Sequence, residues 1–296
     1  EILASIQKVL DKGDYIFGEQ VDLFEKEFLS FLGNKGHFVS CASGTDAITL
    51  ALIANGIKSG SKVIVPSHTA TASIASILNA DCEPLFIDIN EKSLLLSIRE
   101  LKKLAKLKKV KAAVAVHLYG SGVDITELRK VLRGNEVKII EDCAQSVGTF
   151  IKGKHSGTLG DSGCFSFFPT KNLGTLGDGG GVWVPNLTLK NKLISLRQYG
   201  WNKKREVILE SGINSRLDEI QAAILRIKLK YLSADIKRRR DLAKRYDSYL
   251  KSDFQIINQP SHQKSSFHLY VVKHKKRDDL IKYMKAKGIN LGIHYY

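Results

Sequence analysis

The 296-residue sequence lacks the marks of membrane-spanning and of disulfide-stabilised proteins. No run approaches the roughly 20 apolar residues of a membrane span, and residues 1–13 are amphipathic and polar rather than signal-like. The four cysteines include no C-x-x-C pair, which predicts small buried side chains in a reducing compartment and no metal site. These absences predict a cytoplasmic protein that binds no membrane.

Acidic residues are outnumbered, with 46 Lys and Arg against 30 Asp and Glu, for a net charge of +16. The positive charge gathers at 102–111, 237–240 and 273–277, where it alternates with apolar residues at helical spacing. This pattern is typical of solvated helix faces, and the sequence has no aromatic-interleaved basic motif. We therefore expect a basic surface that attracts small anions and binds no nucleic acid.

The first half of the chain alternates short β-branched runs with amphipathic helical segments. The strand candidates are 37–41, 62–65, 84–88, 112–116 and 137–140, and the helix candidates are 46–54, 70–78, 98–107 and 125–132. This alternation predicts an α/β protein with a mostly parallel central sheet and helices on both faces. Ligands of such sheets bind at the carboxyl ends of the strands.

The order of elements changes after residue 160. Short apolar strands at 163–168 and 181–184 flank a glycine-rich loop, and a long helix is predicted over 215–250. A strand at 267–272, a helix at 277–285 and a strand just before Tyr295 complete the pattern. We expect a large domain over 13–235 and a smaller, incomplete C-terminal α+β domain over 236–296, with 1–12 as a further candidate part of it.

Two polar clusters follow predicted strands. Ser43-Gly44-Thr45-Asp46 comes after strand 37–41 and opens a helix, so its N–H groups and hydroxyls form either an anion site or a plain helix cap. Glu141-Asp142-Cys143-Ala144-Gln145 follows strand 137–140. A carboxylate buried there needs a cation or donors, whereas one exposed at the strand end needs neither.

A single lysine stands in the glycine-rich loop. The stretch from Phe165 to Gly174 reads Phe-Ser-Phe-Phe-Pro-Thr-Lys-Asn-Leu-Gly, with Lys171 as its lysine, and continues to the glycines at 177–181. A lysine in a desolvated pocket has a lowered pKa and serves as an amine nucleophile, while a lysine in a flexible surface loop does not. Together, an anion turn, a carboxylate and an amine are the three groups that pyridoxal 5'-phosphate (PLP) requires.

Five motifs in order give the sequence its family resemblance. It resembles the DegT/DnrJ/StrS sugar aminotransferases, which are fold-type I PLP enzymes, over nearly the whole chain from about residue 13 to 295. The motifs are Ser43-Gly44-Thr45-Asp46-Ala47, Val116-His117-Leu118-Tyr119-Gly120, Glu141-Asp142-Cys143-Ala144-Gln145, the Lys171 stretch 165–174, and Asn214-Ser215-Arg216-Leu217-Asp218-Glu219-Ile220-Gln221-Ala222-Ala223.

The resemblance implies a role for each motif residue. Lys171 is the Schiff-base lysine and moves a proton between cofactor and substrate, and Asp142 keeps the pyridine nitrogen protonated. The other residues that the resemblance assigns to the cofactor are Gly44, Thr45, Gln145, Ser166 and, from the neighbouring subunit, Asn214. Those that it assigns to the sugar are His294 and Tyr295.

The implied reaction is a ping-pong transfer of an amino group from L-glutamate to a nucleotide-linked keto sugar. The acceptor would be a dTDP- or UDP-linked 3-keto or 4-keto deoxysugar, made for deoxyamino sugar, polysaccharide or O-antigen biosynthesis. The Arg197-Gln198-Tyr199-Gly200 stretch resembles the 3-amino members more than the 4-amino members. The same resemblance implies a cytoplasmic homodimer with shared active sites.

One position departs from the family pattern. Family members place an aromatic residue over the cofactor ring where this chain has Ala70, so His68 or another group would cover that face. Two alternatives remain open. A PLP-dependent sugar dehydratase of the same fold would carry histidine in place of Lys171, and a non-catalytic protein would bind PLP for regulation or nucleic acid through its basic faces.

Overall fold

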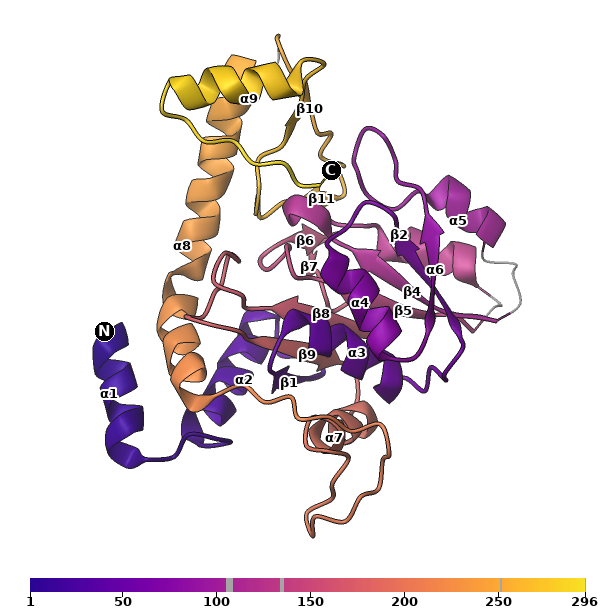
Figure 1. Ribbon diagram of the computed structural model, residues 1–296, viewed down its shortest axis with the longest axis vertical. Helices are drawn as coiled ribbons and strands as arrows, with labels where there is room; N and C mark the ends of the chain where they lie inside the picture. Colours follow the sequence, from indigo (N-terminus) through magenta and orange to yellow (C-terminus); the bar gives the residue numbers. More distant parts are fainter. Residues whose placement is uncertain (105–108, 134–135, 251, 296) are drawn as a thin grey trace.

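The computed structural model describes residues 1–104, 109–133, 136–250 and 252–295. Its centre is a seven-stranded sheet with the strand order β1-β9-β8-β5-β4-β2-β3 (Figure 1). The strands are β1 (His37–Cys41), β2 (Lys62–Pro66), β3 (Glu83–Ile87), β4 (Val110–Val116), β5 (Lys138–Asp142), β8 (Ser162–Ser166) and β9 (Gly180–Val184).

The sheet is mostly parallel, as predicted. Each neighbouring pair from β3 across to β8 is parallel, and β9 is antiparallel to both β8 and β1. Because β1 and β8 are both antiparallel to β9, β1 runs in the common direction. The carboxyl ends of β1, β2, β4, β5 and β8 therefore meet at one edge of the sheet, where ligands of such folds bind.

Helices cover both faces of the sheet (Figure 1). The long helix α8 lies against α2 on one face, and α3 packs on β8 and β9 from the other. The helices of this part are α1 (Ile2–Lys12), α2 (Glu19–Phe31), α3 (Gly44–Ala54), α4 (Thr71–Asn79), α5 (Ile98–Leu104), α6 (Ile125–Leu132), α7 (Leu187–Leu196) and α8 (Glu219–Leu250). The sequence did not predict α2 or α7, and the last three residues of the predicted helix 98–107 lie outside the described residues.

Alternating side chains divide the core between the two faces. On β8, Cys164 joins the apolar cluster on the α3 side, while Phe165 joins the cluster that contains Phe24 and Phe28 of α2. The rings of Phe28 and Phe165 meet edge-on at 5.1 Å between centroids. Burial of both faces explains why the strands are continuous apolar runs.

The C-terminal part differs from its prediction. Only Val272 of the predicted strand 267–272 is in a strand, because Phe267 has a left-handed φ of 46° and Leu269 N–H donates to Tyr119 O at 3.3 Å. The strand expected before Tyr295 is also wrong, since that segment has no regular structure. The observed elements are α9 (Arg277–Ala286) and the short strands β6 (Phe150–Ile151), β7 (Lys154–His155), β10 (Gln255–Ile256), β11 (Gln263–Lys264) and β12 (Val272–Lys273).

The domain division falls within a helix. α8 runs without a break through the boundary expected at 235/236, and it carries the C-terminal part at its far end (Figure 1). α1, for its part, packs on α8. We retain 13–235 and 236–296 as a proposed division, joined by a shared helix rather than by a linker.

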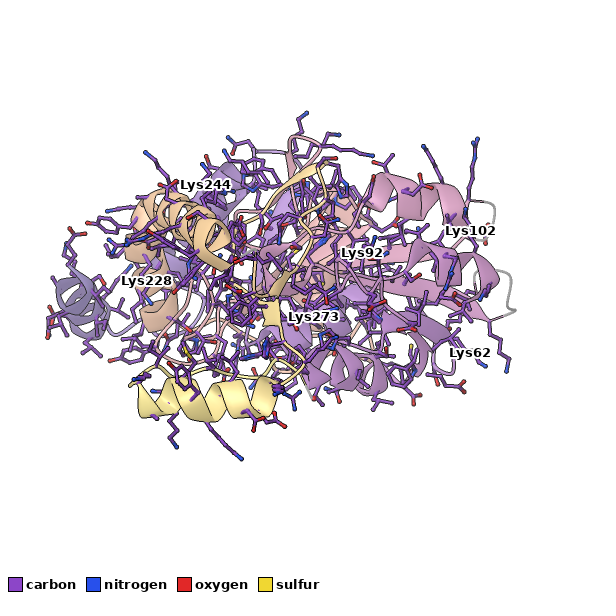
Figure 2. The ribbon with its side chains drawn as sticks, turned by 90° about the horizontal axis from the view of Figure 1, so that it is seen from above. Lys62, Lys92, Lys102, Lys228, Lys244 and Lys273 are labelled. Carbon is purple, nitrogen blue, oxygen red and sulfur yellow. The ribbon has the colours of Figure 1, made fainter. Side chains whose placement is uncertain are left out.

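Some basic residues lie on the surface, and others bond to the backbone of the C-terminal segment. In Figure 2, Lys244 lies on one side of the molecule, and Lys62 and Lys102 lie on the opposite side. By contrast, Arg239 and Arg240, within the basic stretch 237–240, are only partly exposed and donate to backbone carbonyl groups of residues 264–268. The expectation of a solvated face is therefore wrong for these two arginines, which hold the C-terminal segment to α8. Among the described residues, no helix combines the length and apolar character needed to cross a bilayer.

Candidate active site

The turn between β1 and α3 forms one end of the site. Ser43 caps α3, because its Oγ accepts from the N–H of Asp46 at 3.0 Å. The N–H groups of Gly44 and Thr45 lie in the first turn of α3, where backbone N–H groups have no acceptor within the helix. They can therefore donate hydrogen bonds to an anion. A Cβ atom at Gly44 would lie 2.5 Å from Cβ of Ser166, so only glycine allows the end of β8 to approach this turn.

Asp142 lies at the carboxyl end of β5 and is only 5% exposed. Ser73 of α4 donates to its Oδ2 at 2.7 Å, and the backbone N–H of Ala144 donates to its Oδ1 at 3.0 Å. A buried carboxylate is costly without such donors. The sequence left open whether this carboxylate is buried with partners or exposed at the strand end. The structure shows that Asp142 is buried and hydrogen-bonded.

Lys171 lies in the loop after β8, held by a bond from its backbone N–H to Phe168 O at 2.9 Å. Burial lowers the pKa of its amine below the ordinary lysine value, while the charge of Asp142 acts in the opposite direction. The lowered pKa agrees with the expectation for a lysine in a desolvated pocket, since burial disfavours the charged form. More of the amine is then present in the neutral, nucleophilic form.

These groups line a single cavity of about 210 Å³. Its lining includes six of the residues predicted for the cofactor, namely Gly44, Thr45, Asp142, Gln145, Ser166 and Lys171. It also includes Thr69, Ser73 and Asp178, to which the sequence analysis gave no role. An anion turn, a carboxylate and an amine in one cavity fit the phosphate, ring nitrogen and aldehyde of PLP.

Ala70 is among the cavity-lining residues, whereas His68 is not. The Nε2 atom of His68 lies 2.8 Å from the hydroxyl of Tyr119, and its ring meets that of Tyr295 edge-on at 5.7 Å between centroids. His68, the first candidate to cover the cofactor ring, is thus turned toward the tyrosines.

Gln145 connects the cavity to a second, larger one. Its Oε1 accepts from the N–H of Tyr119 at 2.8 Å, and its Nε2 donates to the hydroxyl of Tyr295 at 2.8 Å. Tyr295 and His294, the residues predicted to contact the sugar, line the second cavity of about 570 Å³ together with His68 and Tyr119. The predicted sugar residues therefore lie beside the predicted cofactor residues.

Asn214 is solvent exposed, in the segment that precedes α8, and is not among the lining residues of the first cavity. The adjacent Ser215 is buried and donates to Oδ2 of Asp46 at 2.7 Å, and it accepts from the N–H of Ala42 at 3.0 Å. The Asn214 segment is thus fixed on the α3 turn while the Asn214 side chain faces outward.

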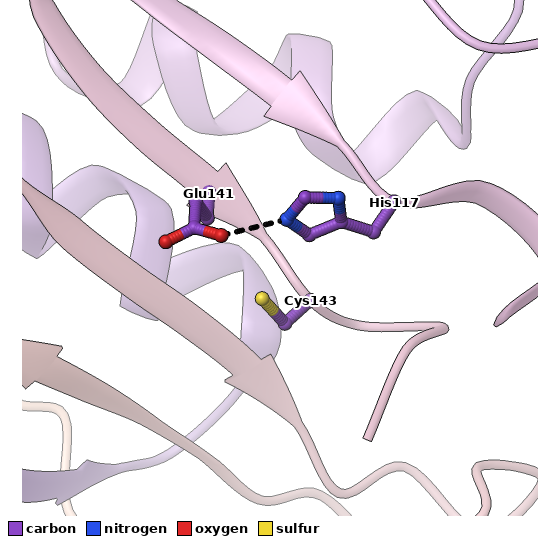
Figure 3. A group of neighbouring side chains, drawn as sticks. All are labelled: His117, Glu141 and Cys143. Carbon is purple, nitrogen blue, oxygen red and sulfur yellow. Dashed lines mark hydrogen bonds and ion pairs between the residues drawn. The ribbon is translucent and has the colours of Figure 1, made fainter. Parts of the chain in front are cut away.

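A buried histidine–glutamate pair supports the strand end that carries Asp142. His117 of the loop after β4 and Glu141 of β5 point toward one another, with the sulfur of Cys143 beside them (Figure 3). The Nδ1 atom of His117 accepts from the N–H of Val123 at 3.0 Å, so Nε2 carries the proton and donates to Glu141 Oε2 at 2.9 Å. The backbone N–H of His117 also donates to Asp142 O at 3.0 Å.

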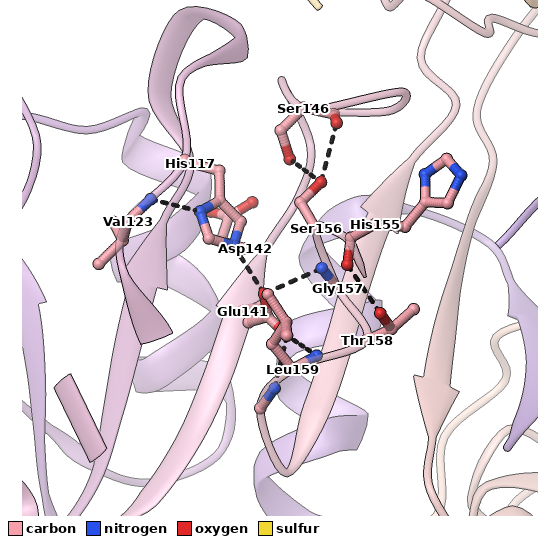
Figure 4. A network of polar contacts seen from close by, with 12 residues as sticks. His117, Val123, Glu141, Asp142, Ser146, His155, Ser156, Gly157, Thr158 and Leu159 are labelled. Atoms are coloured by element: carbon pink, nitrogen blue, oxygen red, sulfur yellow. Dashed lines mark hydrogen bonds and ion pairs between the residues drawn. The ribbon is translucent and has the colours of Figure 1, made fainter. Parts of the chain in front are cut away.

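Glu141 also holds the loop before β8 (Figure 4). Its carboxylate accepts from the backbone N–H groups of Gly157, Leu159 and Gly160 at 2.9, 2.7 and 2.6 Å. The ligand atoms of His117, Glu141 and Cys143 lie within 4.8 Å of one another. However, the first two are fully hydrogen-bonded, and burial raises the pKa of the Cys143 thiol well above its usual range, which disfavours the thiolate that a metal needs. The cluster is therefore a structural anchor.

Replacing Glu141 with alanine should lower the free energy of unfolding by about 3–5 kcal/mol, because the buried N–H of Gly157, the partly buried N–H groups of Leu159 and Gly160, and the buried ring of His117 lose their acceptor. Urea denaturation measures this change. The matched control is Glu127→Ala on α6. Its half-exposed carboxylate pairs with Lys130 at 3.7 Å, so its loss should change stability by less than about 0.5 kcal/mol. Equal stabilities for the two variants would contradict the anchoring role.

Comparison with known proteins gives the chain its relatives. The sequence profile of the DegT/DnrJ/EryC1/StrS aminotransferase family matches residues 1–296. Over its whole length, the chain is 42% identical to dTDP-3-amino-3,6-dideoxy-alpha-D-galactopyranose transaminase from Aneurinibacillus thermoaerophilus, of which it covers 81%. It is also 39% identical over its whole length to a UDP-N-acetyl-3-dehydro-alpha-D-glucosamine 3-aminotransferase from Acidithiobacillus ferrooxidans, of which it covers 79%.

A solved structure agrees with these relatives. The crystal structure of S. venezuelae DesV in complex with a ketimine intermediate superimposes with a TM-score of 0.95 at 37% sequence identity. The match covers 99% of this chain and 79% of that chain.

Proposed function

Because this chain belongs to the DegT/DnrJ/EryC1/StrS aminotransferase family, it is a PLP-dependent nucleotide-sugar aminotransferase, and we propose that it aminates C-3 of its sugar with L-glutamate as donor. Two of its relatives, 42% and 39% identical, are named for 3-amino or 3-dehydro sugars. The Arg197-Gln198-Tyr199-Gly200 stretch favours the same position. The nucleotide is dTDP or UDP.

The observation that supports the proposed cofactor site is the single cavity lined by Lys171, Asp142 and the turn at 43–45. An amine and a carboxylate that face one cavity beside an anion turn match the three ends of one PLP molecule. Had they faced separate cavities, no single cofactor would contact all three.

In the proposed mechanism, bound PLP supplies an electrophilic carbon and a ring that takes up the electrons released at the substrate carbon. Lys171 supplies the amine that holds the cofactor, and then moves a proton at the substrate carbon. Asp142 faces the ring nitrogen and keeps its proton in place. Gly44, Thr45 and Ser166 bind the phosphate at the start of α3.

The sugar side of the site is proposed from the second cavity. His294 and Tyr295, which line that cavity, would contact the sugar, and Gln145, which lines the first cavity and bonds to Tyr295, would contact the cofactor. Asn214, which faces outward, contacts the phosphate bound by a second copy of the chain. The proposed assembly is accordingly a homodimer with shared active sites, acting in the cytoplasm in polysaccharide or O-antigen biosynthesis.

The dehydratase alternative is disfavoured by one residue. Structural neighbours include a GDP-4-keto-6-deoxy-D-mannose-3-dehydratase from E. coli, which is 25% identical to this chain. Dehydratases of this fold use histidine in place of the lysine, whereas this chain has Lys171, whose amine has a pKa lowered by partial burial. Lys171 thus keeps the amine that amino transfer requires, which favours the aminotransferase over the dehydratase.

The reaction is tested by its two halves. With L-glutamate alone, the PLP-loaded protein should lose its aldehyde absorption band and release 2-oxoglutarate in a stoichiometric amount. The aminated protein should then convert dTDP- or UDP-linked 3-keto sugars to amino sugars much faster than 4-keto sugars. Preference for 4-keto sugars would contradict the C-3 proposal, and no response to glutamate would contradict the amino donor.

A further inference from the structure

Ser73 of α4 lies between Asp142 and Thr69. Its hydroxyl is 2.7 Å from Asp142 Oδ2 and 2.9 Å from the hydroxyl of Thr69. Ser73 is only 1% exposed and Thr69 only 7% exposed, so water does not compete freely for these bonds. All three residues line the first cavity.

The direction of each bond follows from the number of protons. A carboxylate oxygen only accepts, so the single hydroxyl proton of Ser73 is donated to Asp142. The Ser73 oxygen is then left as an acceptor, and Thr69 donates to it. The result is a directed chain from Thr69 through Ser73 to Asp142.

The chain fixes the plane of the carboxylate. Ser73 holds Oδ2 from α4, and the N–H of Ala144 holds Oδ1 at 3.0 Å from the other side. Each carboxylate oxygen accepts two bonds, so one position on each oxygen remains for a group in the cavity. The hydroxyl of Ser76, three residues further along α4, donates to backbone carbonyl groups, to Thr45 O at 3.0 Å and to Ala72 O at 2.6 Å, and within the described residues it makes no hydrogen bond to Asp142.

We propose that Ser73, oriented by Thr69, is a positioning residue that aims the carboxylate of Asp142 at the ring nitrogen of PLP. This inference rests on the proposed function, since it concerns the same site. Ser73 acts only through Asp142, so its contribution depends on the ring nitrogen and not on the phosphate or the aldehyde.

The test compares two ligands. Full-length protein freed of cofactor is titrated with PLP and with the PLP analogue in which a carbon replaces the ring nitrogen. Wild type should prefer PLP. In Ser73→Ala this preference should fall by roughly tenfold, the effect of losing one hydrogen bond to a charged group, because only PLP offers the nitrogen that Asp142 must meet. The carbon analogue has no ring nitrogen, so a less well oriented Asp142 carboxylate should leave its binding almost unchanged.

The controls separate positioning from folding. Ser73→Thr keeps the hydroxyl and should retain the wild-type preference, whereas Thr69→Val removes the supporting donor and should lower it. Ser76→Ala should leave the preference unchanged, because any loss applies to both ligands equally.

Two results would overturn the inference. If Ser73→Ala keeps the wild-type preference for PLP, or weakens both ligands to the same extent, Ser73 is only structural. If wild type binds both ligands equally, Asp142 does not meet the ring nitrogen at all. Failure of the proposed function looks different, since wild type would then bind neither ligand.

Discussion

Replacing Lys171 with alanine should reduce turnover by at least about a thousandfold while leaving the fold intact. In the proposed mechanism the side chain supplies both the amine that holds the cofactor and the proton moved at the substrate carbon, so its loss would remove two functions at once. Burial lowers the pKa of this amine, and a surface lysine would not have the same reactivity. Steady-state rates with glutamate and the keto sugar, with circular dichroism as the folding check, measure the effect.

Lys102 provides the matched control. It is an exposed lysine on α5 and lies on the surface (Figure 2). Lys102→Ala should have wild-type rates and a wild-type spectrum. Wild-type turnover by Lys171→Ala would show that another amine does the chemistry.

Asp142→Asn should lower the rate by about two to four orders of magnitude. Asparagine has nearly the same shape, but it carries no charge to hold a proton on the ring nitrogen. Its amide oxygen accepts the Ser73 hydrogen bond, while its NH2 group cannot accept from the N–H of Ala144, so we also expect a loss of about 1–3 kcal/mol in the free energy of unfolding. The rates of both half-reactions should fall, because each needs the ring to take up electrons.

The control for Asp142→Asn is Asp178→Asn, which changes a second carboxylate in the lining of the same cavity. Asp178 is exposed at the glycine-rich loop, and the variant should stay within a few-fold of the wild-type rate. An unaffected rate in Asp142→Asn would mean that another group meets the ring nitrogen.

The sheet could be predicted from the sequence because all of its strands except the edge strand β3 are largely buried. Strand 37–41 and helix 125–132 have the predicted bounds, and the motifs at 43–46, 141–145 and 165–174 all meet at one edge. Parallel strands bring their carboxyl ends together, so residues far apart in sequence were expected to share a site. The family profile confirms the family, and the PLP chemistry follows from it.

Other features depend on tertiary contacts that no local pattern records. The segment 267–271 has β-branched and aromatic residues, but its backbone bonds to Tyr119 and Arg239 instead of to a strand. Ser73 was missed for a similar reason, since its partner Asp142 is 69 residues away. The local sequence offers one signal: Thr69 and Ser73 are four residues apart, across the start of the helix that follows β2.

Reductive trapping tests the central claim most directly. Borohydride treatment of the PLP-loaded protein reduces the bond between cofactor and amine to a stable one, and peptide mapping by mass spectrometry then locates it. We predict a phosphopyridoxyl group on Lys171 and none on the other lysines. A stable adduct on a different lysine, with Lys171 unmodified, would contradict the assignment of the site.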